Sequence, residues 1–176
     1  MVFKSGQMVK DWVRSADGSK VDDKQVQPHG VELTVDKIYE CKGQTVITDD
    51  GYLKSNREEA SLVSAKEYTQ DDYSIEVDDH YFLPAYNSYV VKYNERIEIP
   101  EDHMGLVFPR SRFIRSNNFI STAVWDSGYK GIGEGGLHIN TPTVIEKDMR
   151  IAQIAFAKAK TFDQYDGSHQ GENLDE

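Results

Sequence analysis

Hydrophobic residues in this chain alternate with polar ones far more often than they recur at helical spacing. From Tyr81 to Ile99, β-branched and aromatic residues alternate with polar ones, so Ile97 and Ile99 share one face of an extended chain. Pro100 ends this stretch because it lacks the N–H group that a sheet requires. The pattern therefore predicts a fold built from strands, with at most short helices.

Two segments before residue 70 predict local structure of different kinds. Residues 42–54 indicate a hairpin, because Asp50-Gly51 supplies the positive φ of a tight turn between two runs of strand-forming residues. Residues 57–68 are the one stretch where a helix is expected, although their apolar residues do not form a clean stripe with a period of 3.6.

The second half of the chain predicts further short strands separated by turns. Gly131–Gly136 holds four glycines in six residues and predicts a bend. We expect an all-β barrel or sandwich of mainly antiparallel strands over residues 1–160, as a single domain. Residues 161–176, rich in Asp, Gly, Gln and Asn, predict a flexible tail. The later strands are expected at Met104–Phe108, Phe119–Trp125, Leu137–Asn140 and Arg150–Phe156.

Composition and charge narrow the class of protein. A formal net charge of −10 over 176 residues argues against a nucleic-acid binder, which would need a basic face. No apolar run approaches the roughly 18 residues that span a bilayer, and Met1–Lys10 lacks the apolar stretch of a secretory signal, so a cytoplasmic location is expected. Cys41 is the single cysteine, which excludes an intrachain disulfide and a four-thiolate zinc site.

The charge is unevenly distributed, and this directs the search for a ligand site. Residues 101–160 carry 8 basic and 6 acidic side chains in an otherwise acidic chain. Within them, Phe108–Arg115 holds three arginines and the hydroxyl of Ser111. Guanidinium groups such as those of Arg110 and Arg112 match phosphate oxygens in paired hydrogen bonds, so a polyphosphate fits this segment. A solvated basic edge is the alternative.

Asp126 follows the apolar end of an expected strand and precedes Ser-Gly. An Asp at such a place is either a turn former or, beside a phosphate site, a general base that deprotonates water.

Tyr129, three residues later, either lays its ring against a sugar or fills core space. In Gly131–Gly136 the backbone can approach a flat ligand, or simply turn. Arg150 and Gln153 are polar side chains in an otherwise apolar strand. They either bind a ligand or lie on an exposed edge of the sheet.

In their order, these segments resemble the motifs of the dUTPase and dCTP deaminase superfamily, and most closely its archaeal dUTPase branch. The resemblance is strongest over Ile97–Phe156, which includes Phe-Pro-Arg-Ser, Thr-Ala-Val-Trp-Asp-Ser-Gly-Tyr-Lys-Gly, Gly-Glu-Gly and Arg-Ile-Ala-Gln. Val26–Thr34 is similar to the first motif of the family, and Gln170–Leu174 to its tail.

The resemblance implies a dUTPase-like β-barrel (β-clip), assembled as a homotrimer with active sites between subunits. It implies dUTP as substrate, and Mg²⁺ bound mainly through the triphosphate and waters rather than by a set of side chains. Asp126 would then activate the water that attacks the α-phosphorus, and Tyr129 would pack under the deoxyribose. The resemblance further implies phosphate binding by Arg110, Ser111, Arg112, Arg150 and Gln153, and uracil recognition near Val124, Trp125 and Glu134.

Three positions depart from the family pattern, and two other functions follow from such departures. Glu32 stands where Asp is usual, Arg112 where a small residue is usual, and His169 where the tail tends to have an aromatic residue. One alternative is dCTP deamination, alone or combined with dUTP hydrolysis; the Glu of such deaminases would fall on Gly136, with Glu134 two residues early. The other alternative is a nucleotide sensor without turnover.

Overall fold

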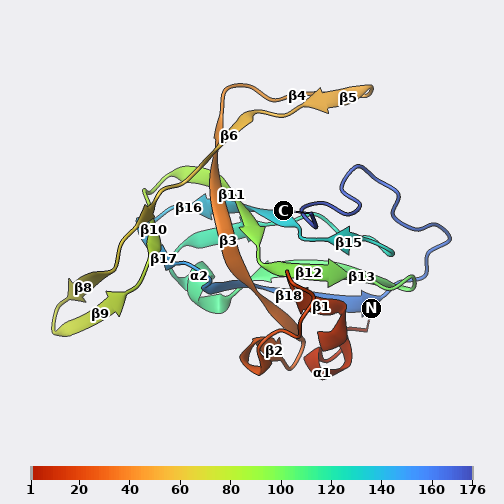
Figure 1. Ribbon diagram of the computed structural model, residues 1–176, viewed down its shortest axis with the longest axis horizontal. Coiled ribbons are helices and arrows are strands. Elements are labelled where there is room, and N and C mark those ends of the chain that lie inside the picture. Colours follow the sequence, from red (N-terminus) through yellow and green to blue (C-terminus); the bar gives the residue numbers. More distant parts are fainter. Residues whose placement is uncertain (1, 176) are drawn as a thin grey trace.

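The computed structural model describes residues 2–175 and confirms the expected all-β fold (Figure 1). Its main sheet runs in the order β13-β18-β3-β11-β16-β14, with β2 and β6 also paired to β3, and curves into a nearly closed barrel. Neighbouring strands of this sheet pair in the antiparallel sense. The strands are β2 (Val26–Gln27), β3 (Gly30–Lys42), β6 (Asn56–Glu59), β11 (Asn87–Tyr93), β13 (His103–Pro109), β14 (Asn118–Ser121), β16 (Glu134–Ile139) and β18 (Arg150–Lys158).

Smaller sheets and two short helices complete the body. The sheets are β1 (Val13–Ser15), β12 (Glu95–Glu98) and β15 (Lys130–Gly131), and β17 (Thr143–Glu146), β10 (His80–Leu83) and β7 (Leu62–Val63). The helices are α1 (Gly6–Val9) and α2 (Ser111–Arg115), with 3₁₀ turns at Lys10–Trp12 and Asp23–Gln25.

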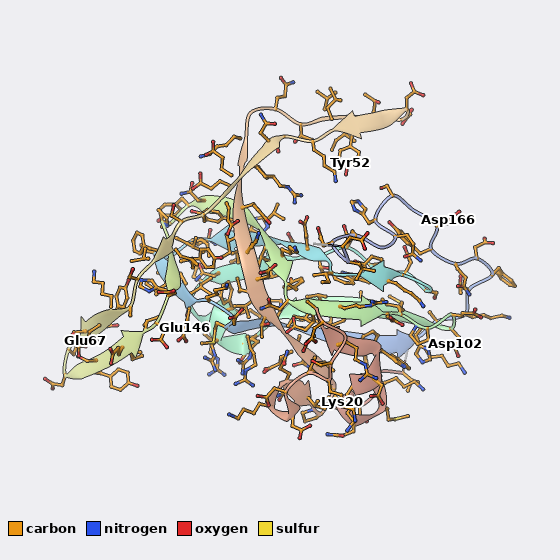
Figure 2. The ribbon with its side chains drawn as sticks, in the orientation of Figure 1. Lys20, Tyr52, Glu67, Asp102, Glu146 and Asp166 are labelled. Carbon is orange, nitrogen blue, oxygen red and sulfur yellow. The ribbon has the colours of Figure 1, made fainter. Side chains whose placement is uncertain are left out.

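Two hairpins project from the body on different sides, as Figure 1 shows. One is β4 (Val46–Thr48) with β5 (Gly51–Leu53), and the other is β8 (Lys66–Gln70) with β9 (Tyr73–Val77). Tyr52 and Glu67 mark them in Figure 2. The first hairpin confirms the turn expected within residues 42–54.

The core lies inside the barrel and follows the alternation of the sequence. Ile97 and Ile99 are buried, whereas Arg96 and Glu98 on the opposite face remain partly exposed. Along β3, Val31, Leu33 and Val35 are buried on one face, and Glu32 on the opposite face is buried as well. Burial of each such side chain contributes roughly 1.5–3 kcal/mol, which is what holds strands of this pattern in register.

The helix expected over residues 57–68 is wrong. This stretch forms β6, which pairs with β3, then β7, which pairs with β10, and then the start of β8. The apolar residues there lack a helical stripe, so a helix would bury little, while the long β3 offers an open edge with free N–H and C=O groups. Pairing with a distant strand therefore overrides the weak local preference.

Two later expectations need smaller corrections. The strand expected at Phe119–Trp125 ends at Ser121, and Trp125 instead forms an isolated bridge with Gly105. The glycine-rich bend is short, because β16 already begins at Glu134. A glycine is required at position 133, since a Cβ there would lie 2.3 Å from Cη2 of Trp125.

Residues 161–176 follow β18, and the described part of this segment returns toward β15 and β16 (Figure 1). The single domain and the flexible tail stay predictions. No helix between residues 2 and 175 has the length and apolar character needed to cross a membrane.

Candidate active site

Two arginines are held side by side by one buried carboxylate. Arg110 lies where β13 ends and α2 begins, and Arg150 starts β18. Because β18 pairs with both β13 and β3, these residues meet Glu32 of β3. Nε of Arg110 lies 2.6 Å from Oε1 of Glu32, and Nη1 of Arg150 lies 2.8 Å from Oε2. Glu32, only 3% exposed, therefore fixes two cationic forks at one edge of the barrel.

Arg110 and Glu32 border an open cavity of about 680 Å³, which we call the arginine pocket, whereas Arg150 lines a different cavity. Burial, followed by the charges of Arg112 and Arg150, lowers the pKa of Arg110 from its ordinary value, while Glu32 opposes the shift. A bound anion would offset the repulsion between neighbouring guanidinium groups. The pocket is lined by Phe3, Gln27, His29, Glu32, Phe108, Pro109, Arg110, Ser111, Gln153 and Ala155.

A second cavity, of about 390 Å³, is built around the segment that follows β14, and we call it the aspartate pocket. The segment is clamped by backbone hydrogen bonds: Gly105 and Trp125 exchange two, of 2.8 and 3.0 Å, and Ile99 N donates to Tyr129 O at 2.9 Å. The pocket is lined by Ala123, Val124, Trp125, Asp126, Tyr129, Glu134, Tyr165, His169 and Glu172.

Asp126 presents an exposed carboxylate to the aspartate pocket. Its backbone carbonyl accepts a hydrogen bond from the N–H of Tyr129 at 3.2 Å, which closes the turn. Within residues 2–175, no hydrogen bond or ion pair is formed by the carboxylate itself. It is therefore a free acceptor, able to bind and deprotonate a water molecule.

Tyr129 forms the buried wall of the same pocket. Its ring packs edge-on against Trp125, with centroids 5.2 Å apart, and against Tyr165 at 5.8 Å. Its hydroxyl donates to Oε1 of Glu172 at 2.8 Å. Burial, and then the charge of Glu172, raise the pKa of Tyr129 far above its ordinary value, so this hydroxyl remains a proton donor.

Arg57 and Glu172 belong to this pocket region but were not among the residues expected from the sequence. Arg57, on β6, binds both carboxylate oxygens of Glu134 at the pocket wall. No sequence signal points to Arg57. A helix was expected over residues 57–68, and that expectation does not include the strand pairing that brings Arg57 to the pocket. For Glu172 a signal exists in the family-like tail Gln170–Leu174, although the tail was expected to be flexible.

The structure divides the expected site residues between separate places. Arg112 and Arg150 line neither the arginine pocket nor the aspartate pocket, but a third cavity beneath the β8–β9 hairpin. The two named pockets share no lining residue. Arg110, Ser111 and Gln153 line the arginine pocket, and Arg150 contacts Glu32 of that pocket by an ion pair. Val124, Trp125, Asp126, Tyr129 and Glu134 line the aspartate pocket.

The donor set of the arginine pocket suits phosphate oxygens rather than a bare cation. No cluster of three or more His, Cys, Asp or Glu side chains suited to a metal occurs in the described part of the chain. Among residues 2–175, Glu32 is the only carboxylate that lines this pocket, and both of its oxygens contact arginines. A divalent cation that arrives with a polyphosphate fits here, because its oxygen ligands come from the phosphates and from water.

Comparison with known proteins identifies the family. A probable deoxyuridine 5′-triphosphate nucleotidohydrolase of Halobacterium salinarum is 33% identical over 174 residues, which cover 99% of this chain and 97% of the relative. The deoxyuridine 5′-triphosphate nucleotidohydrolase of Methanocaldococcus jannaschii is 31% identical, over 86% of this chain and 90% of its own.

A solved structure shows the same fold, and a family model matches most of the chain. The crystal structure of 2′-deoxycytidine 5′-triphosphate deaminase from Agrobacterium tumefaciens has the same fold, with a TM-score of 0.62 at 17% identity. The match covers 89% of this chain, which spans about half (48%) of that longer protein. The model of the dCTP deaminase-like family matches residues 3–159. This chain belongs to the dCTP deaminase-like family.

Proposed function

We propose that this protein hydrolyses dUTP to dUMP and pyrophosphate, as the names of its archaeal relatives state for those proteins. The observation that carries the proposal is the unpaired carboxylate of Asp126 at a pocket whose wall is the buried ring of Tyr129. An enzyme that hydrolyses the phosphoanhydride of a nucleotide uses this combination of a base that activates water and a flat surface that holds the sugar. The reaction would lower the concentration of dUTP and supply dUMP. This role fits the cytoplasmic location expected from the sequence.

The arrangement assigns a role to each side of the site. Asp126 accepts a proton from water, whose oxygen attacks the α-phosphorus while the bond to the bridging oxygen of the β-phosphate breaks. Pyrophosphate leaves into a cationic environment made by Arg110 and Arg150, with Ser111 and Gln153 as further donors. Arginine positioning and charge neutralisation carry most of the rate enhancement in such transfers.

The recognition of uracil falls to the aspartate pocket. Val124, Trp125 and Glu134 surround it, and the close contact of Gly133 with Trp125 keeps this wall compact. A compact pocket of this kind disfavours a base with an added methyl group, such as thymine.

We propose a homotrimer with sites between subunits, and the separation of the two pockets supports it. One nucleotide needs both the arginine pocket and the aspartate pocket, yet within one chain they share no wall. In a closed ring each chain offers its arginine pocket to the aspartate pocket of a neighbour, so three complete sites form.

Mg²⁺ is the cation proposed to accompany the triphosphate. When bound, it supplies positive charge that stabilises the phosphoryl-transfer transition state. Its ligands would be phosphate oxygens and water, and Glu32, the carboxylate between Arg110 and Arg150, would hold such waters.

The test is to incubate the purified protein and Mg²⁺ with dUTP and, separately, with dCTP, and to separate the products by chromatography. We expect dUMP and pyrophosphate from dUTP, little product from dCTP, and loss of most activity in Asp126→Asn. Asp72→Asn, an exposed aspartate in the β8–β9 turn, is the matched control and keeps wild-type activity.

Two results would assign a different function to the protein. Appearance of dUTP or dUMP from dCTP would make the protein a deaminase, as the fold of the Agrobacterium enzyme allows. Binding of dUTP without turnover would make it a sensor. The place expected for the deaminase Glu is occupied by Gly136, which lies in β16 opposite Ser121.

A further inference from the structure

The segment Gln170–Asn173 is hydrogen-bonded along the wall of the aspartate pocket of its own chain. It lies beside Gly128–Ile132, the backbone that carries Tyr129. This attachment makes the segment part of the wall. The bonds run from Gly171 N to Lys130 O (2.7 Å), Ile132 N to Glu172 O (3.0 Å), Lys130 N to Gln170 Oε1 (3.0 Å), Gln170 Nε2 to Gly128 O (3.0 Å) and Asn173 Nδ2 to Ile132 O (2.7 Å).

The attached segment delivers one carboxylate into the pocket, with both oxygens engaged. Oε1 of Glu172 accepts the hydroxyl proton of Tyr129 at 2.8 Å, and Oε2 lies 2.9 Å from Nδ1 of His169. The Glu172 side chain is only 23% exposed. Its position is therefore fixed from two sides by side chains and along its backbone by β15 and its neighbours.

The space for this contact exists because residue 131 is glycine. A Cβ at Gly131 would lie 2.6 Å from the Tyr129 hydroxyl oxygen and 3.2 Å from Cγ of Glu172. The backbone thus approaches the phenol and the carboxylate as closely as a chain can, and any side chain at this position would push them apart.

We infer that Glu172 is a positioning residue that holds the phenol of Tyr129 against the sugar and thereby sets the preference for deoxyribose over ribose. This inference rests on the proposed function. Discrimination against a single hydroxyl needs a wall that does not yield, with groups held to within about 0.5 Å. Trp125 and Tyr165 pack against the ring of Tyr129 in T-shaped geometry, whereas Glu172 accepts the hydrogen bond of its hydroxyl.

The experiment measures kcat/KM for dUTP and for UTP with the full-length protein and Mg²⁺. In Glu172→Ala the ratio of the two values should fall about tenfold, mostly because UTP becomes a better substrate. Glu172→Gln retains a carbonyl oxygen that accepts the Tyr129 proton, so it should keep the wild-type ratio. Asp175→Ala, an exposed carboxylate of the same tail, is the matched control.

A double-mutant cycle links the effect to the tyrosine. Tyr129→Phe should lose the same selectivity, and Glu172→Ala should add little to it, because both remove one hydrogen bond. A merely structural role for Glu172 would lower the values for dUTP and UTP in parallel and leave their ratio unchanged. That outcome, or a Gln variant as unselective as Ala, would overturn the inference.

Calorimetric binding of the non-hydrolysable α,β-imido analogues of dUTP and UTP separates this inference from the proposed function. A wild-type protein that prefers the deoxy analogue, loses the preference in Glu172→Ala, and yet releases no dUMP would refute hydrolysis alone. Equal wild-type affinity for both analogues, or no binding of either, would refute the role of Glu172.

Discussion

Arg57 and Glu134 join two parts of the chain that are 77 residues apart: Nη1 of Arg57 lies 2.7 and 2.8 Å from the two carboxylate oxygens of Glu134. Arg57 comes from β6, at the base of the β4–β5 hairpin, and Glu134 begins β16 on the wall of the aspartate pocket. The pair keeps one of the three carboxylates of this pocket neutralised and fixed in place.

Removal of the guanidinium should therefore weaken substrate binding more than catalysis. In Arg57→Met the carboxylate of Glu134 loses its counter-charge next to the site of an anionic nucleotide. We expect the KM for dUTP to rise about fivefold, with kcat within about twofold of wild type, in steady-state kinetics. Arg14→Met, which breaks a surface pair with Asp11, should change neither value; a fall in kcat alone would contradict this role for Arg57.

Glu32 should matter for stability as well as for phosphate binding. Glu32→Gln leaves Arg110 and Arg150 without their shared counter-charge at a partly buried site, so we expect a loss of about 2 kcal/mol in the free energy of unfolding by urea. Glu98→Gln, which weakens a half-exposed pair with Arg96, should cost less than about 1 kcal/mol. Equal losses in the two variants would show that the paired arginines do not depend on Glu32.

The buried carboxyl of Glu95 should make stability depend on pH. Burial raises its pKa from 4.5 to about 7, although Thr34 and Gln25 donate hydrogen bonds to it. Because the folded pKa lies above the unfolded one, this group favours folding most when protonated, and its contribution declines as the pH rises from about 4.5 to about 7. The decline amounts to roughly 3 kcal/mol.

Thermal unfolding of Glu95→Gln between pH 4 and pH 8 tests this. The amide does not titrate, so the variant should lose the part of the pH slope that lies below pH 7, while Glu98→Gln on the same strand should keep it. A variant with the wild-type slope would mean that the pKa of Glu95 is the same in the folded and unfolded states.

Mixing of two inactive variants tests whether sites are shared between chains. Asp126→Asn damages the aspartate pocket and Arg110→Ala the arginine pocket, so each variant alone should be nearly inactive. In the proposed trimer, co-assembled from equal amounts of both variants, about a quarter of the sites would pair two intact pockets, so activity should recover to about a quarter of wild type. No recovery in verified mixed trimers would indicate that each chain carries a complete site.

The sequence predicted the parts of this fold that depend on local alternation. Ile97 and Ile99 are buried as their spacing indicates, and the turn before Gly51 forms a hairpin. Residues 57–68 could not be predicted in the same way, because their strands exist only through pairing with β3 and β10, which are distant in sequence.

In the candidate site, too, the features with a local sequence pattern were predicted, and those that depend on distant contacts were not. The segments around Arg110 and Asp126 carry short motifs, so sequence alone indicated them. Arg57 and Glu172 contact pocket residues that lie 77 and 43 residues away in the sequence. The tail motif pointed to the segment that holds Glu172, but no local pattern indicated either of these contacts. Tertiary hydrogen bonds of this kind become visible only when the barrel is formed.

The unique thiol of Cys41 offers a way to observe the aspartate pocket during turnover. Cys41 is exposed on β3, directly opposite Arg57 in the β3–β6 pairing. A fluorophore attached there would lie opposite Arg57, whose guanidinium binds Glu134 on the pocket wall. With a single attachment point in the chain, any change in its emission on addition of nucleotide would report from this one place.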